Sequence, residues 1–337
     1  MSETESRERV GPVVGQGVDA GTMTPATPSA ATIADQADGI DVVTDYGLEI
    51  EARSQWAYAR RRFMRHRLAM VSLGVLILIS LAGIFASRIA PYPYASQDFL
   101  ASGLSPTLKG KHYFGTDFLG RDYFSRVIYG IRTSLWVALV VSGLSTLIGT
   151  LVGAVAGYYR GWVDNLLMRL TDLVLTLPGL AVLLTAAAFL GNGRPLRVAI
   201  ILALLFWTGL ARIVRGSFLS LREKEYVEAA KAAGSGDIRI MLRHMLPNAV
   251  GPIVVNATLV VGVAILTEAA LSFLGFGVQP PTPALGKLIN DGQELAQQMW
   301  WLVTFPGLTI VLIVLCINFI GDGLRDALDP TQRRTRA

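Results

Sequence analysis

The sequence predicts an all-α, polytopic membrane protein with about six transmembrane helices. Hydrophobic residues make up 52% of the 337 residues and charged residues only 16%, whereas soluble domains average roughly 25% charged residues. Several apolar runs reach the length of about 20 residues that a helix needs to cross a bilayer. These runs are continuous and do not alternate in polarity with period 2, which excludes a transmembrane barrel.

Six apolar runs qualify as spans, and each is bounded by charges or by Gly and Pro. They are residues 68–88, 134–157, 172–190, 197–214, 249–274 and 300–320. With six alternating spans, the segments on the side of the N-terminus carry about twice as many Lys and Arg as those on the other side. Cytoplasmic segments are enriched in Lys and Arg, so we expect both termini in the cytoplasm.

Residues 1–50 differ from the rest of the chain, with nine acidic residues, two basic residues and a single aromatic residue. Such a segment cannot bury enough apolar surface to fold, and it lacks the apolar stretch of a signal peptide. We therefore interpret residues 1–52 as a disordered cytoplasmic tail, with a binding arm as the alternative. Residues 331–337 are interpreted as a short C-terminal tail.

Residues 53–133 are expected to hold the first span and an external loop. Within this loop, residues 116–133 predict an amphipathic helix at the outer membrane interface, with charged and apolar side chains on opposite sides. Thr116 or Asp117 would cap the start of that helix.

Residues 212–247 form the longest stretch without a span after residue 134. Helix formers predominate up to Ala233, and Gly234 suits the position just after a helix end. A second helix is expected because apolar residues then recur at i, i+3, i+4 and i+7, and Pro247 is expected to end it. The residues of this apolar stripe are Ile238, Met241, Leu242 and Met245. The small side chains of the first helix suit either a protein partner or this protein's own membrane domain.

The same loop carries Glu228-Ala229-Ala230, then Gly234, and nine residues later x-x-Leu246-Pro247. This pattern resembles the EAA loop of permease subunits of binding-protein-dependent ABC importers. His244 stands where the family usually has Ile, and His244 to Asn248 is similar to the peptide-importer branch. Four further segments resemble the C-type permease of dipeptide and oligopeptide importers, in order along residues 55–330. They are residues 115–132, 157–164, 271–281 and 321–330.

The resemblance implies the type I ABC importer permease fold, in a bacterial cell membrane, with a peripheral first span and a core of five spans in residues 134–330. It also implies the partners: a second homologous permease, two ATP-binding subunits or a fused ATPase, an extracytoplasmic peptide-binding protein, and a peptide substrate. ATP and Mg would be bound by the partner subunits. The helix of the EAA loop would be the coupling helix that docks in a groove of the ATPase. The candidate coupling residues are Glu225, Glu228, Ala229, Ala230, Gly234, Leu246 and Pro247.

Polar and helix-breaking residues within the spans are candidates for the translocation path or gate. They are Glu268, Asn256 and Pro178. Glu268 lies about 24 Å along a helix from Pro252, in the outer part of the bilayer; snorkelling or an ion pair within the subunit is the alternative. Docking of the binding protein is one interpretation of the external charged residues, and a simple elbow before the second span is the other. These charged residues are Asp117, Arg121, Asp122 and Arg126.

Missing motifs narrow the function further. No G-x-x-x-x-G-K-[ST] motif is present, so we expect a non-catalytic subunit without a cofactor of its own. The three histidines lie far apart and predict no metal site. The net charge of +5 arises from arginines that flank apolar runs, which fits a membrane better than nucleic acid. The alternatives are related importers of nickel chelates, haem or glutathione, a secondary transporter that works alone, and a membrane enzyme or assembly scaffold.

Overall fold

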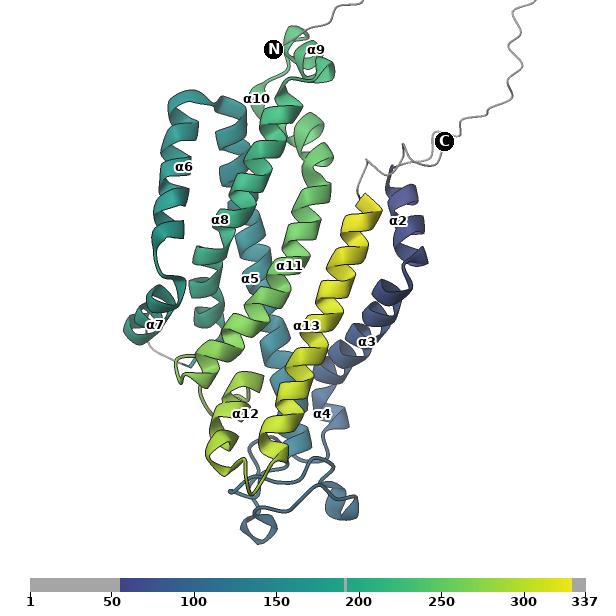
Figure 1. Cartoon of the computed structure of the whole chain (residues 1–337), viewed down its shortest axis with the longest axis vertical. Coiled ribbons are helices and arrows are strands. Elements are labelled where there is room, and N and C mark those ends of the chain that lie inside the picture. The colour runs from purple at the N-terminus through teal and green to yellow at the C-terminus, as the bar shows by residue number, and fades with distance from the viewer. Residues whose placement is uncertain (1–54, 191–192, 329–337) are drawn as a thin grey trace, which may run out of the picture. The chain divides into compact units, whose positions relative to one another are not determined.

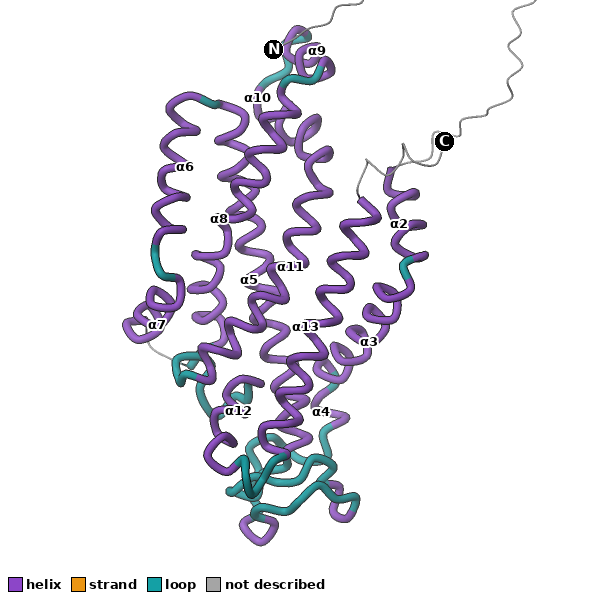
Figure 2. The backbone as a smooth tube through the Cα atoms, viewed as in Figure 1, coloured by secondary structure: helices purple, strands orange, loops and turns teal. Residues whose placement is uncertain are grey.

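The computed structural model describes residues 55–190 and 193–328 (Figure 1). Helices dominate this part of the chain, and Figure 2 shows no strand in it. The all-α class is therefore confirmed. The expected tails, residues 1–52 and 331–337, lie outside the described residues, so both tails, and the disorder of the first, stay predictions.

Five helical stretches of the described residues are long and apolar enough to cross a membrane. They are α3 (Arg67–Ile84), α5 (Tyr123–Tyr159), α8 (Pro195–Arg222), the stretch Asp237–Phe273 and α13 (Trp301–Leu328). A sixth span would be the bent pair α6 (Gly161–Thr176) and α7 (Gly179–Leu190). About six spans were expected, and each expected run overlaps one of these elements.

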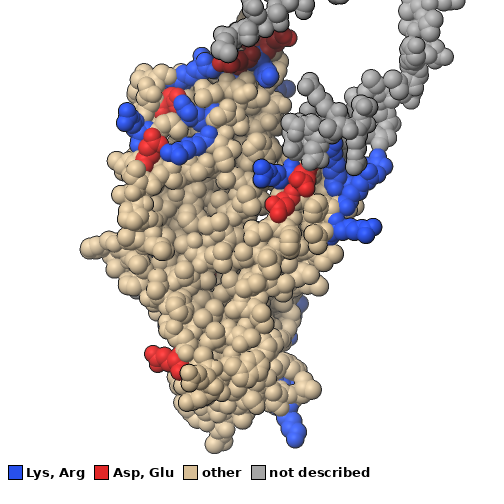
Figure 3. All heavy atoms as spheres, in the orientation of Figure 1, with Lys and Arg blue, Asp and Glu red and all other residues tan. Residues whose placement is uncertain are grey.

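Shorter helices lie at the two ends of this bundle. They are α2 (Gln55–Arg65), α4 (Ala86–Ile89), α9 (Glu225–Ala232) and α12 (Leu285–Gly292), with 3-10 turns at Phe99–Ala101, Lys109–Lys111 and Gln293–Leu295. We call the end that carries α9 the α9 end and the opposite one the α12 end (Figure 1). Figure 3 shows charged side chains gathered near the α9 end and α2, and a broad uncharged surface between the two ends. An uncharged belt of this kind suits the hydrocarbon core of a bilayer.

The predicted interfacial helix at residues 116–133 is wrong in part, because only residues 123–133 are helical and they belong to the long helix α5. Residues 116–122 form a tight loop, and α5 begins at Tyr123 and continues without a break to Tyr159. Asp122 caps this helix, because its carboxylate accepts a hydrogen bond from the Ser125 backbone N–H at 2.8 Å. The helix cannot start earlier because Gly120 has φ +71° and packs so closely on the Asp98 carbonyl that a Cβ there would overlap it.

The third expected span, residues 172–190, is not a single helix. α6 begins earlier than expected, at Gly161, and meets α7 at a bend of 86°. Leu177 precedes Pro178 and has extended backbone angles, φ −72° and ψ 136°. A residue before proline is pushed out of the helical region by the proline ring, so this break follows from Pro178.

The second helix of the 212–247 segment does not end at Pro247. α10 (Asp237–Arg239), a π-helical turn (Ile240–Met245) and α11 (Leu246–Phe273) follow one another in a single helical stretch. In the π turn the Leu246 N–H bonds to the Met241 carbonyl, five residues earlier. The wider turn lets Pro247, which has no N–H to donate, follow without breaking the helix.

Close packing of α5 on α8 holds the centre of the bundle together. Three glycines of α5 face α8 at four-residue spacing: Gly149, Gly153 and Gly157. A Cβ at Gly149 would lie 2.7 Å from the Trp207 carbonyl oxygen, and one at Gly157 would lie 2.7 Å from the Phe218 Cβ. Small residues at this spacing let two membrane helices approach until their backbones touch.

Candidate functional site

The helix α9 lies outside the apolar belt and shows two different faces. Val227 is buried and Ala230 is half-buried, so this face packs on the rest of the chain. Glu225, Glu228 and Ala229 are exposed. One side of α9 therefore packs on the protein's own bundle, whereas a protein partner on the other, exposed side stays a prediction.

Gly234 ends α9 in the predicted way. Its φ is +76°, and the N–H groups of Gly234 and Ser235 donate to the carbonyls of Lys231 and Ala230 at 2.9 and 3.0 Å. This pair of bonds is the Schellman arrangement, which needs a left-handed residue just after the helix. The predicted position of Gly234 after the helix end is confirmed.

A buried apolar cluster anchors α9 to three long helices. Val227 of α9 packs in it with Tyr158 of α5, Phe218 of α8, and Ile240 and Met245 of the π turn. Leu246 packs against the same cluster, whereas Pro247 is exposed. A helix fixed to α5, α8 and α11 in this way cannot move without moving what it is packed on.

The predicted apolar stripe of the second loop helix is wrong in part. Ile238 and Leu242 are exposed at 67% and 59% of their surface, while Ile240 and Met245 are buried. The stripe assumed 3.6 residues per turn, and the π turn changes that register. Asn248 stabilises the altered turn, because its side-chain amide donates to the His244 carbonyl at 2.7 Å.

Two ion pairs fasten α6 to α8 near the α9 end. Arg215 binds both carboxylate oxygens of Asp164, at 2.5 and 2.7 Å. Arg212, one turn before Arg215 in α8, donates to Asp172, two turns after Asp164 in α6, at 2.6 Å. The bidentate pair has the geometry of the stronger kind of charge-assisted hydrogen bond.

Glu268 is fully buried between α5 and α11. Its two carboxyl oxygens accept hydrogen bonds from Ser134 Oγ of α5 at 2.9 Å and Ser272 Oγ of α11 at 2.7 Å. Ser272 Oγ in turn accepts the Val278 N–H at 3.2 Å. Neither snorkelling nor an ion pair with a described residue occurs in this conformation. Glu268 joins two helices and the loop that follows α11.

The other two path candidates do not lie with Glu268. Asn256 is on the same helix but twelve positions earlier, about 18 Å away along the axis. Its Oδ1 is buried and has no hydrogen-bond partner among the described residues, as is also true of the Thr146 and Thr150 hydroxyls of α5. Pro178 is exposed at the bend between α6 and α7. The three candidates therefore form no single site here.

The charged residues predicted for docking are mostly buried at the α12 end. Asp117 Oδ2 accepts from Arg121 Nε and Arg126 Nη1, each at 2.7 Å. Arg126 also lies 3.7 Å from Asp291, which binds Lys287 at 2.9 Å. Asp122 caps α5 and pairs with His112 at 2.9 Å. Asp117, Asp122 and Arg126 are buried within the chain and offer no docking surface, whereas Arg121 is half-buried, so the expectation is wrong for three of the four residues.

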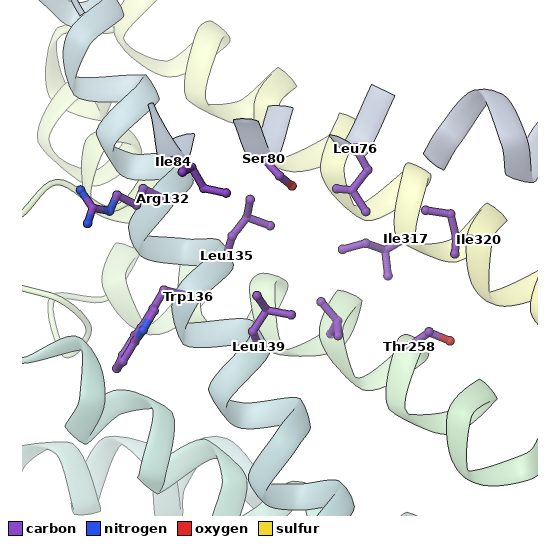
Figure 4. Close-up of a pocket in the computed structure, with 11 residues that line it drawn as sticks. Leu76, Ser80, Ile84, Arg132, Leu135, Trp136, Leu139, Thr258, Ile317 and Ile320 are labelled. Carbon is purple, nitrogen blue, oxygen red and sulfur yellow. The ribbon is translucent and has the colours of Figure 1, made fainter. Parts of the chain in front are cut away.

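An apolar groove of about 360 Å³ opens between α3, α5, α11 and α13. Figure 4 shows Leu76 and Ile84 of α3 facing Leu135 and Leu139 of α5, with Arg132 at one end. The lining suits an apolar occupant, either acyl chains or a further helix. Among the described residues, no group of three or more His, Cys, Asp or Glu is arranged to hold a metal ion.

The fold and these features define a multi-pass α-helical membrane protein. At one end it carries a short helix, α9, with one face packed on the bundle and the other face exposed. The family model described as "Binding-protein-dependent transport system inner membrane component" matches residues 149–334. The model "N-terminal TM domain of oligopeptide transport permease C" matches residues 54–106. The chain belongs to the family of binding-protein-dependent transport system inner membrane components, the permease subunits of ABC importers.

Three relatives are similar over most of their length. The oligopeptide transport system permease protein OppC of Haemophilus influenzae is 40% identical over 299 residues, 88% of this chain and 96% of that protein. The dipeptide transport system permease protein DppC of Alkalihalophilus pseudofirmus is 41% identical over 288 residues, 84% and 92% of the two chains. The glutathione transport system permease protein GsiD of Escherichia coli is 42% identical over 283 residues, 83% and 92%.

Several of these features had no clear signal in the sequence. The π turn, the cap at Asp122 and the buried pair of Asp117 with Arg126 all depend on contacts with distant segments. The glycines of α5 did carry a signal, since their four-residue spacing within an apolar run is typical of close helix packing.

Proposed function

We propose that this chain is the permease subunit of an ATP-driven importer of dipeptides or oligopeptides. The observation that carries the proposal is the similarity, at about 40% identity over 88% of the chain, to a permease named for oligopeptide transport. The segment matched by the oligopeptide permease model supports the same cargo. A peptide-binding protein outside the membrane delivers the peptide.

The helix α9 is the coupling helix in this proposal. Its exposed face, with Glu225, Glu228 and Ala229, docks in a groove on an ATPase subunit. The opposite face is anchored through Val227 to α5, α8 and α11. ATP and Mg bind to the ATPase partners, whose closure displaces α9, and this chain itself performs no catalysis.

The α9 end lies in the cytoplasm, together with both termini. The charge distribution supports this orientation, because Lys and Arg gather near α9 and α2 (Figure 3). The α12 end then faces the binding protein, and its exposed surface receives that protein. A second, related permease completes the path.

The peptide passes near the middle of α5 and α11. The buried, unpaired oxygen atoms of Asn256, Thr146 and Thr150 support this choice, since such atoms are costly to bury and would be satisfied by a polar cargo or water once α5 and α11 separate and expose them. Glu268 belongs to the gate at the outer side. It changes partners when α5 and α11 separate.

Affinity purification of the tagged chain from its native membrane tests the assembly. A second multi-span permease and P-loop ATPases should copurify with it. The purified complex in proteoliposomes, with its binding protein, should then take up labelled dipeptides or oligopeptides only when ATP is hydrolysed. A chain that purifies alone and monodisperse, or uptake without ATP, would contradict the proposal.

Glutathione is a second candidate cargo, because GsiD is 42% identical to this chain over 283 residues. Competition in the same vesicles separates the two. Labelled dipeptide should be taken up and excess unlabelled glutathione should not reduce that uptake if the cargo is a general peptide, whereas labelled glutathione alone should be taken up if glutathione is the cargo.

A further inference from the structure

The turn between α5 and α6 makes contacts on both sides of α9. Arg160 Nη2 donates to Glu223 Oε1 at 2.7 Å, and Glu223 lies two residues before α9 begins. Tyr158 Oη donates to Asp237 Oδ1 at 2.7 Å, and Asp237 begins the helix that follows α9. One short segment therefore holds the chain on the near and the far flank of the same helix.

The Tyr158 ring strengthens this arrangement. It is buried in the apolar cluster beneath α9 together with Val227. The Arg222 guanidinium, at the end of α8, lies 5.9 Å from the ring centroid, and the Lys231 ammonium, in the last turn of α9, lies 5.8 Å away. Cations at these distances are attracted to the ring. Tyr158 thus touches the segments before, within and after α9.

Arg160 has a backbone conformation that its residue type rarely adopts. Its φ is 57° and its ψ is −166°, a region used almost only by glycine. Its side chain reaches the Glu223 carboxylate and comes within 3.4 Å of the Leu219 carbonyl. The hydrogen bond and charge of Arg160 hold the pKa of Glu223 below its ordinary value, as expected for a carboxylate paired with a guanidinium. A costly backbone conformation persists only where surrounding contacts hold it.

The helix that ends at this turn is long and reaches the other end of the bundle. α5 has 37 residues, about 55 Å of helix. Ser134, about 36 Å from Tyr158 along the axis, binds Glu268 near the α12 end. No break interrupts α5 between these two points, so the helix provides a direct connection from its end near α9 to the Ser134–Glu268 contact.

We propose that Tyr158 and Arg160 are the residues that pass a displacement of α9 to α5. They act as positioning residues and touch no substrate. The inference rests on the proposed function, in which α9 docks on the ATPase. It gives that function a defined route: from α9, through Glu223 and Asp237, into α5, and along α5 to the contact between Ser134 and Glu268.

The test uses the assembled complex in proteoliposomes and measures peptide taken up per ATP hydrolysed. Tyr158→Phe keeps the ring and removes only the hydroxyl. We expect it to lower uptake per ATP about tenfold, the factor for a lost hydrogen bond to a charged acceptor, while ATP hydrolysis stays within about twofold. Tyr159→Phe is the matched control, because the neighbouring Tyr159 hydroxyl bonds to none of the described residues, and it should behave as the wild type.

The ion pair provides a second, independent arm. Arg160→Glu should lower uptake per ATP, and adding Glu223→Arg should restore it by rebuilding the pair in reverse. Arg160→Gly relieves the backbone strain but also removes the side chain. Its uptake of peptide per ATP should therefore be as low as that of Arg160→Glu if the contact with Glu223 matters.

Each other outcome has a clear meaning. Unchanged uptake per ATP in both Tyr158→Phe and Arg160→Glu would overturn the inference. Failure of Tyr158→Phe to assemble would also overturn it, because the hydroxyl would then be structural. A wild-type complex that hydrolyses ATP but imports no peptide would refute the proposed function itself.

Discussion

Gly234 allows a sharp test of α9, because its surroundings separate the effect of backbone strain from the effect of a steric clash. Its φ is +76°, and a Cβ built on its backbone would have no atom within 4 Å. A Cβ added at this position therefore acts through the backbone conformation and not through a clash within this chain. A left-handed conformation costs an L-residue about 1–2 kcal/mol, with asparagine the most tolerant.

The size of the effect can be ordered in advance. Gly234→Asn should be nearly silent, Gly234→Ala should cost about 1 kcal/mol, and the β-branched Gly234→Val should cost about 2 kcal/mol. These energies lower the population of molecules with an intact C-terminal end of α9 by about 5-fold for alanine and about 30-fold for valine. The cost falls on the two bonds from Gly234 and Ser235 that close α9. We therefore expect uptake of peptide per ATP to fall in the order Asn, Ala, Val.

The assay is the same vesicle system, with ATP hydrolysis and peptide uptake measured side by side. Wild-type coupling in Gly234→Val would remove Gly234 from the coupling mechanism. If Gly234→Asn were as defective as Gly234→Val, the reasoning from φ would fail. An obstruction of the docking partner by the side chain would then explain both variants.

Three further predictions concern buried contacts. Glu268→Gln should keep one bond as an acceptor and reverse the other, with its amide N–H donating to a serine hydroxyl, and should keep most uptake. Glu268→Leu removes the acceptor of both serine hydroxyls and should cost about 1–3 kcal/mol each, seen as a lower Tm of the purified complex. Asp117→Ala leaves Arg126 buried without its closest partner, and should lower the free energy of unfolding by about 3–5 kcal/mol, measured by denaturant titration in detergent. Val227→Ala loosens α9 by about 2 kcal/mol and should raise proteolysis within α9 without preventing membrane insertion. A stable Asp117→Ala variant, unchanged melting of Glu268→Leu, or an equally protected α9 in Val227→Ala would contradict the respective argument.

The spans and the end of α9 could be predicted because their signals are local. An apolar run of about 20 residues has one good solution in lipid, a helix. Gly234 follows a stretch of helix formers, and a left-handed residue is what closes a helix there. Neither inference needs a contact with a distant part of the chain.

The start of α5 could not be predicted in the same way. Thr116, Asp117 and Asp122 are all good caps by residue type. The choice of Asp122 depends on the close approach of Gly120 to the Asp98 carbonyl, which brings together segments about twenty residues apart. The burial of Asp117 follows from the same folding of the loop, so exposed charges were expected where buried pairs occur.

Arg160 shows what such a departure from local rules indicates. The neighbouring Gly161, with φ +60°, is the residue type expected to make the turn, yet Arg160 is also in a region that only glycine occupies readily. A local rule fails where long-range contacts decide the backbone, and the contacts at this turn are the exposed pair of Arg160 with Glu223 and the Tyr158 side chain packed beneath α9. Real proteins break local rules mainly at functional or strained positions. The exception therefore lies at a turn that contacts both flanks of α9, where the proposed relay from α9 to α5 needs a fixed connection.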